Sequence, residues 1–156
     1  MSKIYIAYGS NMDTAQMAYR CPDAKLIGTG LIHGYQLLFK DSGSGSYATI
    51  EPKKGCVVPA YIWLISDADE KRLDRYEGFP TFYYKKDIMF KMTGDTEDEN
   101  PHMGMAYIMH EDRELGAPTA EYFDVLASAY DEQGWDKQIL HDALDVTFRA
   151  WEADAK

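Results

Sequence analysis

The sequence of 156 residues is poor in cysteine, in basic residues and in long apolar segments. Its two cysteines, Cys21 and Cys56, could form at most one disulfide bond, and without an export signal we expect free thiols. No apolar run approaches the ~20 residues of a membrane-spanning helix. Met1-Ser2-Lys3 leads into a strand-like segment with no secretory leader. We therefore expect a cytoplasmic protein that has no membrane partner.

Basic side chains are outnumbered, because 16 Lys and Arg residues face 26 Asp and Glu residues and leave a net charge of −10. This balance argues against nucleic-acid binding, in which Lys and Arg neutralise phosphates. The excess lies in the second half: residues 1–78 hold nine basic and nine acidic residues, whereas residues 79–156 hold 7 and 17. An anionic small molecule is therefore easier to bind in the first half.

The usual motifs of metal, cofactor and serine-hydrolase sites are also missing. The cysteines form no C-x-x-C pair. The four histidines do not have the spacing of metal ligands: His33, His102, His110 and His141. The chain contains no G-x-G-x-x-G, and Ser10 does not lie in a G-x-S-x-G turn. We therefore expect no metal site and no cofactor.

What the sequence does contain is a hydrophobic fraction of 46% with 13% aromatic residues, which indicates one folded domain over residues 1–156. Apolar and β-branched runs predict strands over 3–8, 25–33, 35–39, 47–50, 57–65, 83–92 and 105–109. Helical patterns cover 12–19, 67–76, 119–133 and 136–153. The segment 41–46 is interpreted as a solvated loop. The expected class is α+β, a small mixed barrel or curled sheet with flanking helices.

The first candidate site is Tyr8-Gly9-Ser10-Asn11, between the first strand and the first helix. Gly9 lets the backbone approach a ligand closely, and the N–H groups that follow can hold an anion. Ser10 and Asn11 add a hydroxyl and an amide. The alternative is an ordinary strand-to-helix turn in which Asn11 caps the helix.

The second candidate is Glu77, four residues after Leu73 in the helix that begins near residue 67. This spacing places both residues on one helix face, and Leu73 should point into the core. A partly buried carboxylate at a helix C-terminus is destabilised by desolvation and by the helix dipole. Its pKa should therefore rise toward neutrality, as suits a general acid and base. The alternative is a glutamate at an exposed helix end. The solvated face of the helix is expected to hold Lys71, Arg72, Asp74 and Arg75.

These segments belong to a longer series that recurs in order: Tyr8-Gly9-Ser10-Asn11-Met12, Ala48-Thr49-Ile50, Trp63, Leu73 to Gly78, Tyr83, Ala106-Tyr107-Ile108-Met109, Ala117-Pro118, Tyr122 and Gly134. In this order the chain resembles the gamma-glutamylcyclotransferase-like family of the AIG2-like superfamily, from about residue 4 to 145. The resemblance implies a single domain with a small α+β barrel and cofactor-independent cleavage of gamma-glutamyl amides, which releases 5-oxoproline.

The resemblance also implies roles for individual residues. Glu77 matches the catalytic glutamate of the family, and the matching substrate-binding residues are Tyr8, Gly9, Ser10, Asn11, Tyr83 and Tyr107. The expected partner is a small gamma-glutamyl amino acid or amine. Two alternatives stay open: removal of a gamma-glutamyl group from a specialised carrier or metabolite, and a binding module that kept the pocket without turnover.

Overall fold

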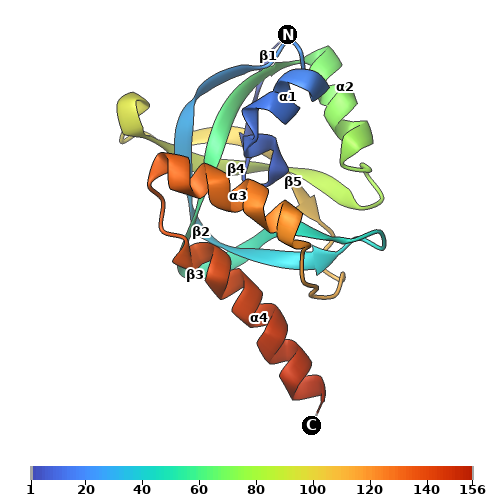
Figure 1. Cartoon of the computed structure of the whole chain (residues 1–156). Helices are drawn as coiled ribbons and strands as arrows, with labels where there is room; N and C mark the ends of the chain where they lie inside the picture. Colours follow the sequence, from blue (N-terminus) through green and yellow to red (C-terminus); the bar gives the residue numbers. More distant parts are fainter. Residues whose placement is uncertain (1, 156) are drawn as a thin grey trace.

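In the computed structural model, which describes residues 2–155 apart from the side chain of Thr96, the strands close into a barrel. They are β1 (Ser2–Ala7), β2 (Lys25–Asp41), β3 (Ser46–Ser66), β4 (Tyr83–Thr93) and β5 (His102–Met109). Their order is β1-β3-β2-β4-β5, and β1 closes the barrel by pairing in parallel with β5 (Figure 1). The predicted α+β class with a small mixed barrel is confirmed.

The helices lie outside the barrel: η1 (Ser10–Met12), α1 (Thr14–Arg20), α2 (Asp67–Tyr76), η2 (Gly94–Thr96), α3 (Ala120–Gln133) and α4 (Gln138–Asp154). Figure 1 shows α1 and α2 near the end of the barrel that holds the N-terminus, α3 across its side, and α4 running away toward the C-terminus. Three of the four predicted helices agree with α2, α3 and α4 to within two residues. No helix of residues 2–155 is long and apolar enough to cross a membrane.

Two pairs of predicted short strands are each one long strand in the structure. The segments 25–33 and 35–39 are joined in β2, and the segments 47–50 and 57–65 are joined in β3. His33 pairs with Val57 while Tyr35 pairs with Pro52, so β3 bulges where Gly34 turns β2 with a φ of +80°. Such a bulge bends a strand without ending its pairing, which a pattern of apolar runs does not reveal.

The part of β3 predicted to be central is buried on both faces. This segment pairs with β1 on one side and with β2 on the other. Side chains on its two faces and on the neighbouring strands are at most 2% exposed: Ile6, Tyr61, Ile62, Ile65 and Ile108. The paired strands β1 and β3 therefore fix the positions of the segment that follows β1 and of the helix that follows β3.

Polar contacts fix α1 against α2 at this end of the barrel. Cys21 directly follows α1, and its thiol donates to the carbonyl of Asp69 in α2 at 3.7 Å. The fully buried Asp69 carboxylate also accepts a hydrogen bond from the backbone N–H of Asp23 at 3.4 Å. These contacts bring the two candidate segments, residues 8–11 and residue 77, to the same end of the molecule.

Candidate active site

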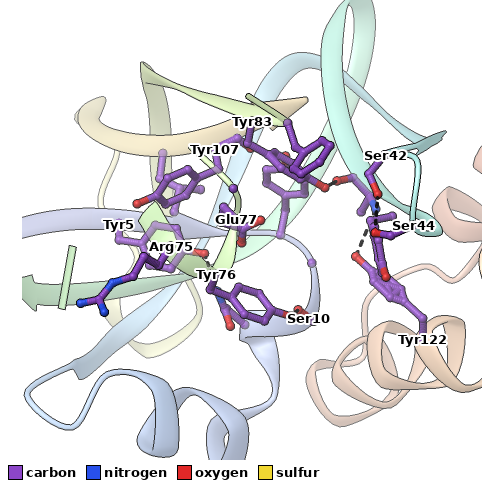
Figure 2. Close-up of a pocket in the computed structure, with 18 residues that line it drawn as sticks. Tyr5, Ser10, Ser42, Ser44, Arg75, Tyr76, Glu77, Tyr83, Tyr107 and Tyr122 are labelled. Atoms are coloured by element: carbon purple, nitrogen blue, oxygen red, sulfur yellow. Dashed lines mark hydrogen bonds between the residues drawn. The ribbon is translucent and has the colours of Figure 1, made fainter. Parts of the chain in front are cut away.

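A cavity of about 290 Å³ opens where the end of β1 meets the end of α2. The residues singled out in the sequence all line it: Tyr8, Gly9, Ser10, Asn11, Glu77, Tyr83 and Tyr107. They come from separate elements, since Tyr83 begins β4 and Tyr107 lies in β5. In Figure 2 the Glu77 carboxyl lies among the surrounding tyrosine rings. The structure thus brings the two candidate segments together around one space.

The turn after β1 differs from the one predicted. A single helix over 12–19 was expected, with Asn11 as its possible cap, but the chain forms the short turn η1 and then α1. The cap of α1 is Asp13, whose carboxylate accepts from the N–H groups of Ala15 and Gln16 at 3.0 and 3.1 Å. Because Asn11 does not cap the helix, its buried side chain can contact other residues near the cavity.

Residues 9 to 11 present backbone donors at the edge of the cavity. Ser10 and Asn11 are the first residues of η1, and the first N–H groups of a helical turn have no partner inside it. The indole N–H of Trp63 donates to the Asn11 carbonyl at 3.2 Å and fixes the position of the turn. The N–H groups of Ser10 and Asn11, two residues that line the cavity, are thus candidates to bind a carboxylate.

Glu77 owes its position to the two ends of α2. At the start of the helix, the Ser66 hydroxyl accepts from the Asp69 N–H at 3.1 Å, and the Asp69 carboxylate accepts from the Ser66 N–H at 3.3 Å. At the end, the Glu77 N–H donates to the carbonyl of the buried Leu73 at 2.8 Å. Gly78 then reverses the chain with a φ of +65°.

The Glu77 carboxyl is in an unusual state for a glutamate. Burial raises its pKa from 4.5 to about 7, and the positive charge of Arg20 opposes this shift. Within residues 2–155 no hydrogen bond to the carboxyl stabilises its charged form. Glu77 as a residue is half-buried, since it lines the cavity, and its surroundings are mostly tyrosine rings. A carboxyl with a pKa near 7 can both accept and return a proton at neutral pH.

Three tyrosine hydroxyls at the cavity already donate to protein acceptors. Tyr8 donates to the carbonyl of Tyr107, and Tyr83 donates to the carbonyl of Ala48 at 2.9 Å. Tyr107 donates to the carboxylate of Asp74 at 2.6 Å. Because each hydroxyl has one hydrogen, these three side chains offer a ligand their ring faces and oxygen lone pairs.

Two other tyrosines keep their hydroxyl hydrogens for the cavity. The Tyr5 oxygen accepts from the Asn11 side-chain amide at 2.9 Å, and the Tyr122 oxygen accepts from the Ala48 N–H at 3.1 Å. Both residues line the cavity. The absence of a side chain at Gly9 makes room here, because a Cβ would lie 3.1 Å from the Tyr122 hydroxyl oxygen. Tyr5 and Tyr122 can therefore donate their hydroxyl hydrogens to an acceptor in the cavity.

The sequence did not indicate several residues of the cavity wall. Ser42 and Ser44, in the connection interpreted as a solvated loop, line the cavity, and Ser42 is buried. Asp74 was placed on the solvated face of the helix, but it is half-buried and accepts a hydrogen bond from Tyr107. Arg75 is exposed, as expected, and also lines the cavity. Tyr122 was noted only in the series of matching residues. No local pattern marks these residues, since each reaches the cavity through contacts between distant segments.

The structure offers no cluster for a metal ion in the part that it describes. Across residues 2–155, no group of three or more His, Cys, Asp or Glu side chains is arranged to hold one.

A closed barrel with a carboxyl whose pKa is raised to about 7 in a tyrosine-lined cavity fits a small enzyme that works by acid and base catalysis. Comparison with known proteins gives the family. The sequence model of the family described as "Gamma-glutamyl cyclotransferase, AIG2-like" matches residues 5–131. The chain belongs to this family, and its enzyme class is that of the cyclotransferases.

Individual relatives agree with this assignment. Over 140 residues the chain is 24% identical to the human gamma-glutamylcyclotransferase and 25% identical to the bovine one, covering 85% of this chain and 72% of each relative. A solved structure named gamma-glutamyl cyclotransferase superposes with a TM-score of 0.78 at 20% identity, over 92% of this chain and 86% of that one. The structural likeness shows that the two proteins share the fold.

Proposed function

We propose that the protein cleaves gamma-glutamyl amides by intramolecular attack of the glutamyl α-amine and releases 5-oxoproline. The observation that carries this proposal is the Glu77 carboxyl, whose pKa burial raises to about 7 and which lines the same cavity as the Tyr8–Asn11 turn. Family membership supports cyclotransferase chemistry in general. The identity of the gamma-glutamyl substrate is part of the proposal.

The groups around the cavity suit the polar ends of a gamma-glutamyl amide. Its α-carboxylate is an anion, and the Ser10 and Asn11 N–H groups at the start of η1 can hold it. Its γ-carbonyl becomes negatively charged when the carbon is attacked, and the hydroxyl hydrogens of Tyr5 and Tyr122 can stabilise that charge. A cavity of about 290 Å³ matches the small end of the range for ligand pockets.

The proton transfers need only one carboxyl group. Glu77, in its charged form, takes a proton from the substrate α-ammonium, and the freed nitrogen forms a bond to the γ-carbon. The tetrahedral intermediate then breaks its bond to the leaving nitrogen, which receives the proton from Glu77. The ring nitrogen still carries one proton more than an amide does, and Glu77 passes this second proton to the released amine. The products are 5-oxoproline and an ammonium ion, and Glu77 is again charged. Holding the glutamyl chain folded favours closure of the five-membered ring.

The test measures 5-oxoproline release from a panel of gamma-glutamyl amino acids, gamma-glutamyl amines and larger gamma-glutamyl metabolites. The parent chain should release 5-oxoproline from at least one of them, and Glu77→Gln should lose about 10²-fold or more of kcat. The preferred amide identifies the leaving group. Binding of 5-oxoproline by a folded parent chain without turnover of any amide would contradict the proposal and support a binding module.

A further inference from the structure

Arg20 contacts two residues of the cavity wall, although it does not line the cavity itself. It is the last residue of α1 and is half-buried. Its Nη1 donates to Asn11 Oδ1 at 2.6 Å, and its guanidinium carbon lies 3.6 Å from the centre of the Tyr76 ring. A planar guanidinium that stacks on a ring and bonds to an amide is held in one orientation.

We propose that Arg20 is a positioning residue of the active site, which sets the direction of the hydrogen bonds of Asn11 and Tyr5 and supplies a positive charge near Glu77. The inference rests on the proposed cyclotransferase function, because it concerns the same cavity. Arg20 does not line the cavity and acts through Asn11, Tyr5 and Glu77, which do.

The kinds of hydrogen bond that each group can form set the direction of the bonds from Arg20 through Asn11 to Tyr5. A guanidinium can only donate, so the oxygen of the Asn11 amide must face Arg20. The Asn11 nitrogen then faces Tyr5 and donates to its hydroxyl oxygen at 2.9 Å. Tyr5 therefore keeps its hydrogen for an acceptor in the cavity. Without a donor at position 20 the amide could turn over, and Tyr5 would then donate to the amide oxygen.

The groups around Glu77 show why the charge of Arg20 affects its carboxyl. The described titratable side chains that interact electrostatically with its carboxyl are Tyr5, Tyr8, Tyr83, Tyr107, Tyr122 and Arg20. Burial raises the pKa of each of these tyrosines, so they are neutral when Glu77 titrates. Arg75 also lines the cavity, but its side chain points away from Glu77 in Figure 2. Arg20 is thus the cation that favours the charged carboxyl.

A direct titration of Glu77 tests the effect of the charge without any turnover. Isotope-edited NMR of labelled glutamate carboxyls, assigned with Glu77→Gln, would follow the parent chain, Arg20→Gln, Arg20→Lys and the control Arg149→Gln. Arg149 is an exposed residue of α4, which contributes nothing to the cavity. We expect the Glu77 midpoint to move to higher pH in Arg20→Gln only. An Arg20→Gln curve that coincides with the parent curve would overturn this effect of the charge.

Kinetics across about pH 5 to 9 test the positioning role. Arg20→Lys keeps the charge but not the planar stack, so its pH midpoint should match the parent while kcat/KM falls about tenfold. Arg20→Gln should show the higher midpoint. A kcat/KM equal to the parent value in Arg20→Lys would overturn the positioning role. A parent chain with no 5-oxoproline release would instead refute the proposed function, and the NMR titration would still decide the effect of the Arg20 charge.

Discussion

Replacing Glu77 by glutamine should stabilise the fold above neutral pH, although it removes the proposed proton carrier. Burial raises the carboxyl pKa from 4.5 to about 7, so between these values the folded chain keeps a proton that the unfolded chain releases. The free energy of unfolding therefore falls as the pH rises through this window and stays lower above it. At about 1.4 kcal/mol per unit of pKa difference, the full cost is about 3 kcal/mol. This is an upper value, since the carboxyl faces an open cavity.

Urea unfolding of the parent chain and Glu77→Gln at about pH 5 and about pH 8 measures this cost. The two proteins should differ little at the lower pH, whereas at the higher pH the variant should be more stable by up to about 3 kcal/mol. For a chain of this length, that difference raises Tm by several degrees. The matched control is Glu152→Gln, at an exposed position of α4. An equal difference between parent and Glu77→Gln at both pH values would refute the reasoning.

Three further substitutions test how the cavity is built. Gly78→Ala should cost about 2 kcal/mol or more in thermal unfolding, because φ is +65° and the new Cβ would lie 2.4 Å from Phe82 Cδ2; an unchanged Tm would contradict this. Gly9→Ala should lower kcat/KM about tenfold, because its Cβ would lie 3.1 Å from the Tyr122 hydroxyl oxygen; parent-like kinetics would show that Tyr122 need not hold this position. Asp74→Asn should reduce the free energy of urea unfolding by about 1–2 kcal/mol, since the hydrogen bond from Tyr107 and the ion pair with Lys85 both lose their charged acceptor. No loss would count against a structural role for these two contacts.

The local features of α2 could be predicted because their causes lie within one short segment. The predicted range 67–76 is the observed one, with a capping box of Ser66 and Asp69 at its start and Gly78, with a positive φ, just after its end. The spacing from Leu73 to Glu77 placed the carboxyl on the buried face. Desolvation of that carboxyl was expected from the same spacing, and the structure gives the raised pKa.

The turn after β1 was harder to predict, because its side chains bond to residues from other elements. Asn11 was considered as a helix cap on its residue type, yet its carbonyl accepts from Trp63 and its amide bridges Arg20 and Tyr5. A capping residue next along the chain, Asp13, takes the role instead. Local preference therefore identified the right segment but assigned the cap to the wrong residue.

The sequence by itself determined the α+β class, the bounds of most helices and the two segments that meet at the cavity, because periodicity and local motifs act within a few residues. Only the tertiary structure decided which hydroxyl hydrogens face the cavity and which residues complete its wall. Those outcomes depend on contacts such as the one between the Tyr8 hydroxyl and the Tyr107 carbonyl, which lie 99 residues apart. Closure of the barrel between β1 and β5 creates that contact, and no property of either segment alone requires it.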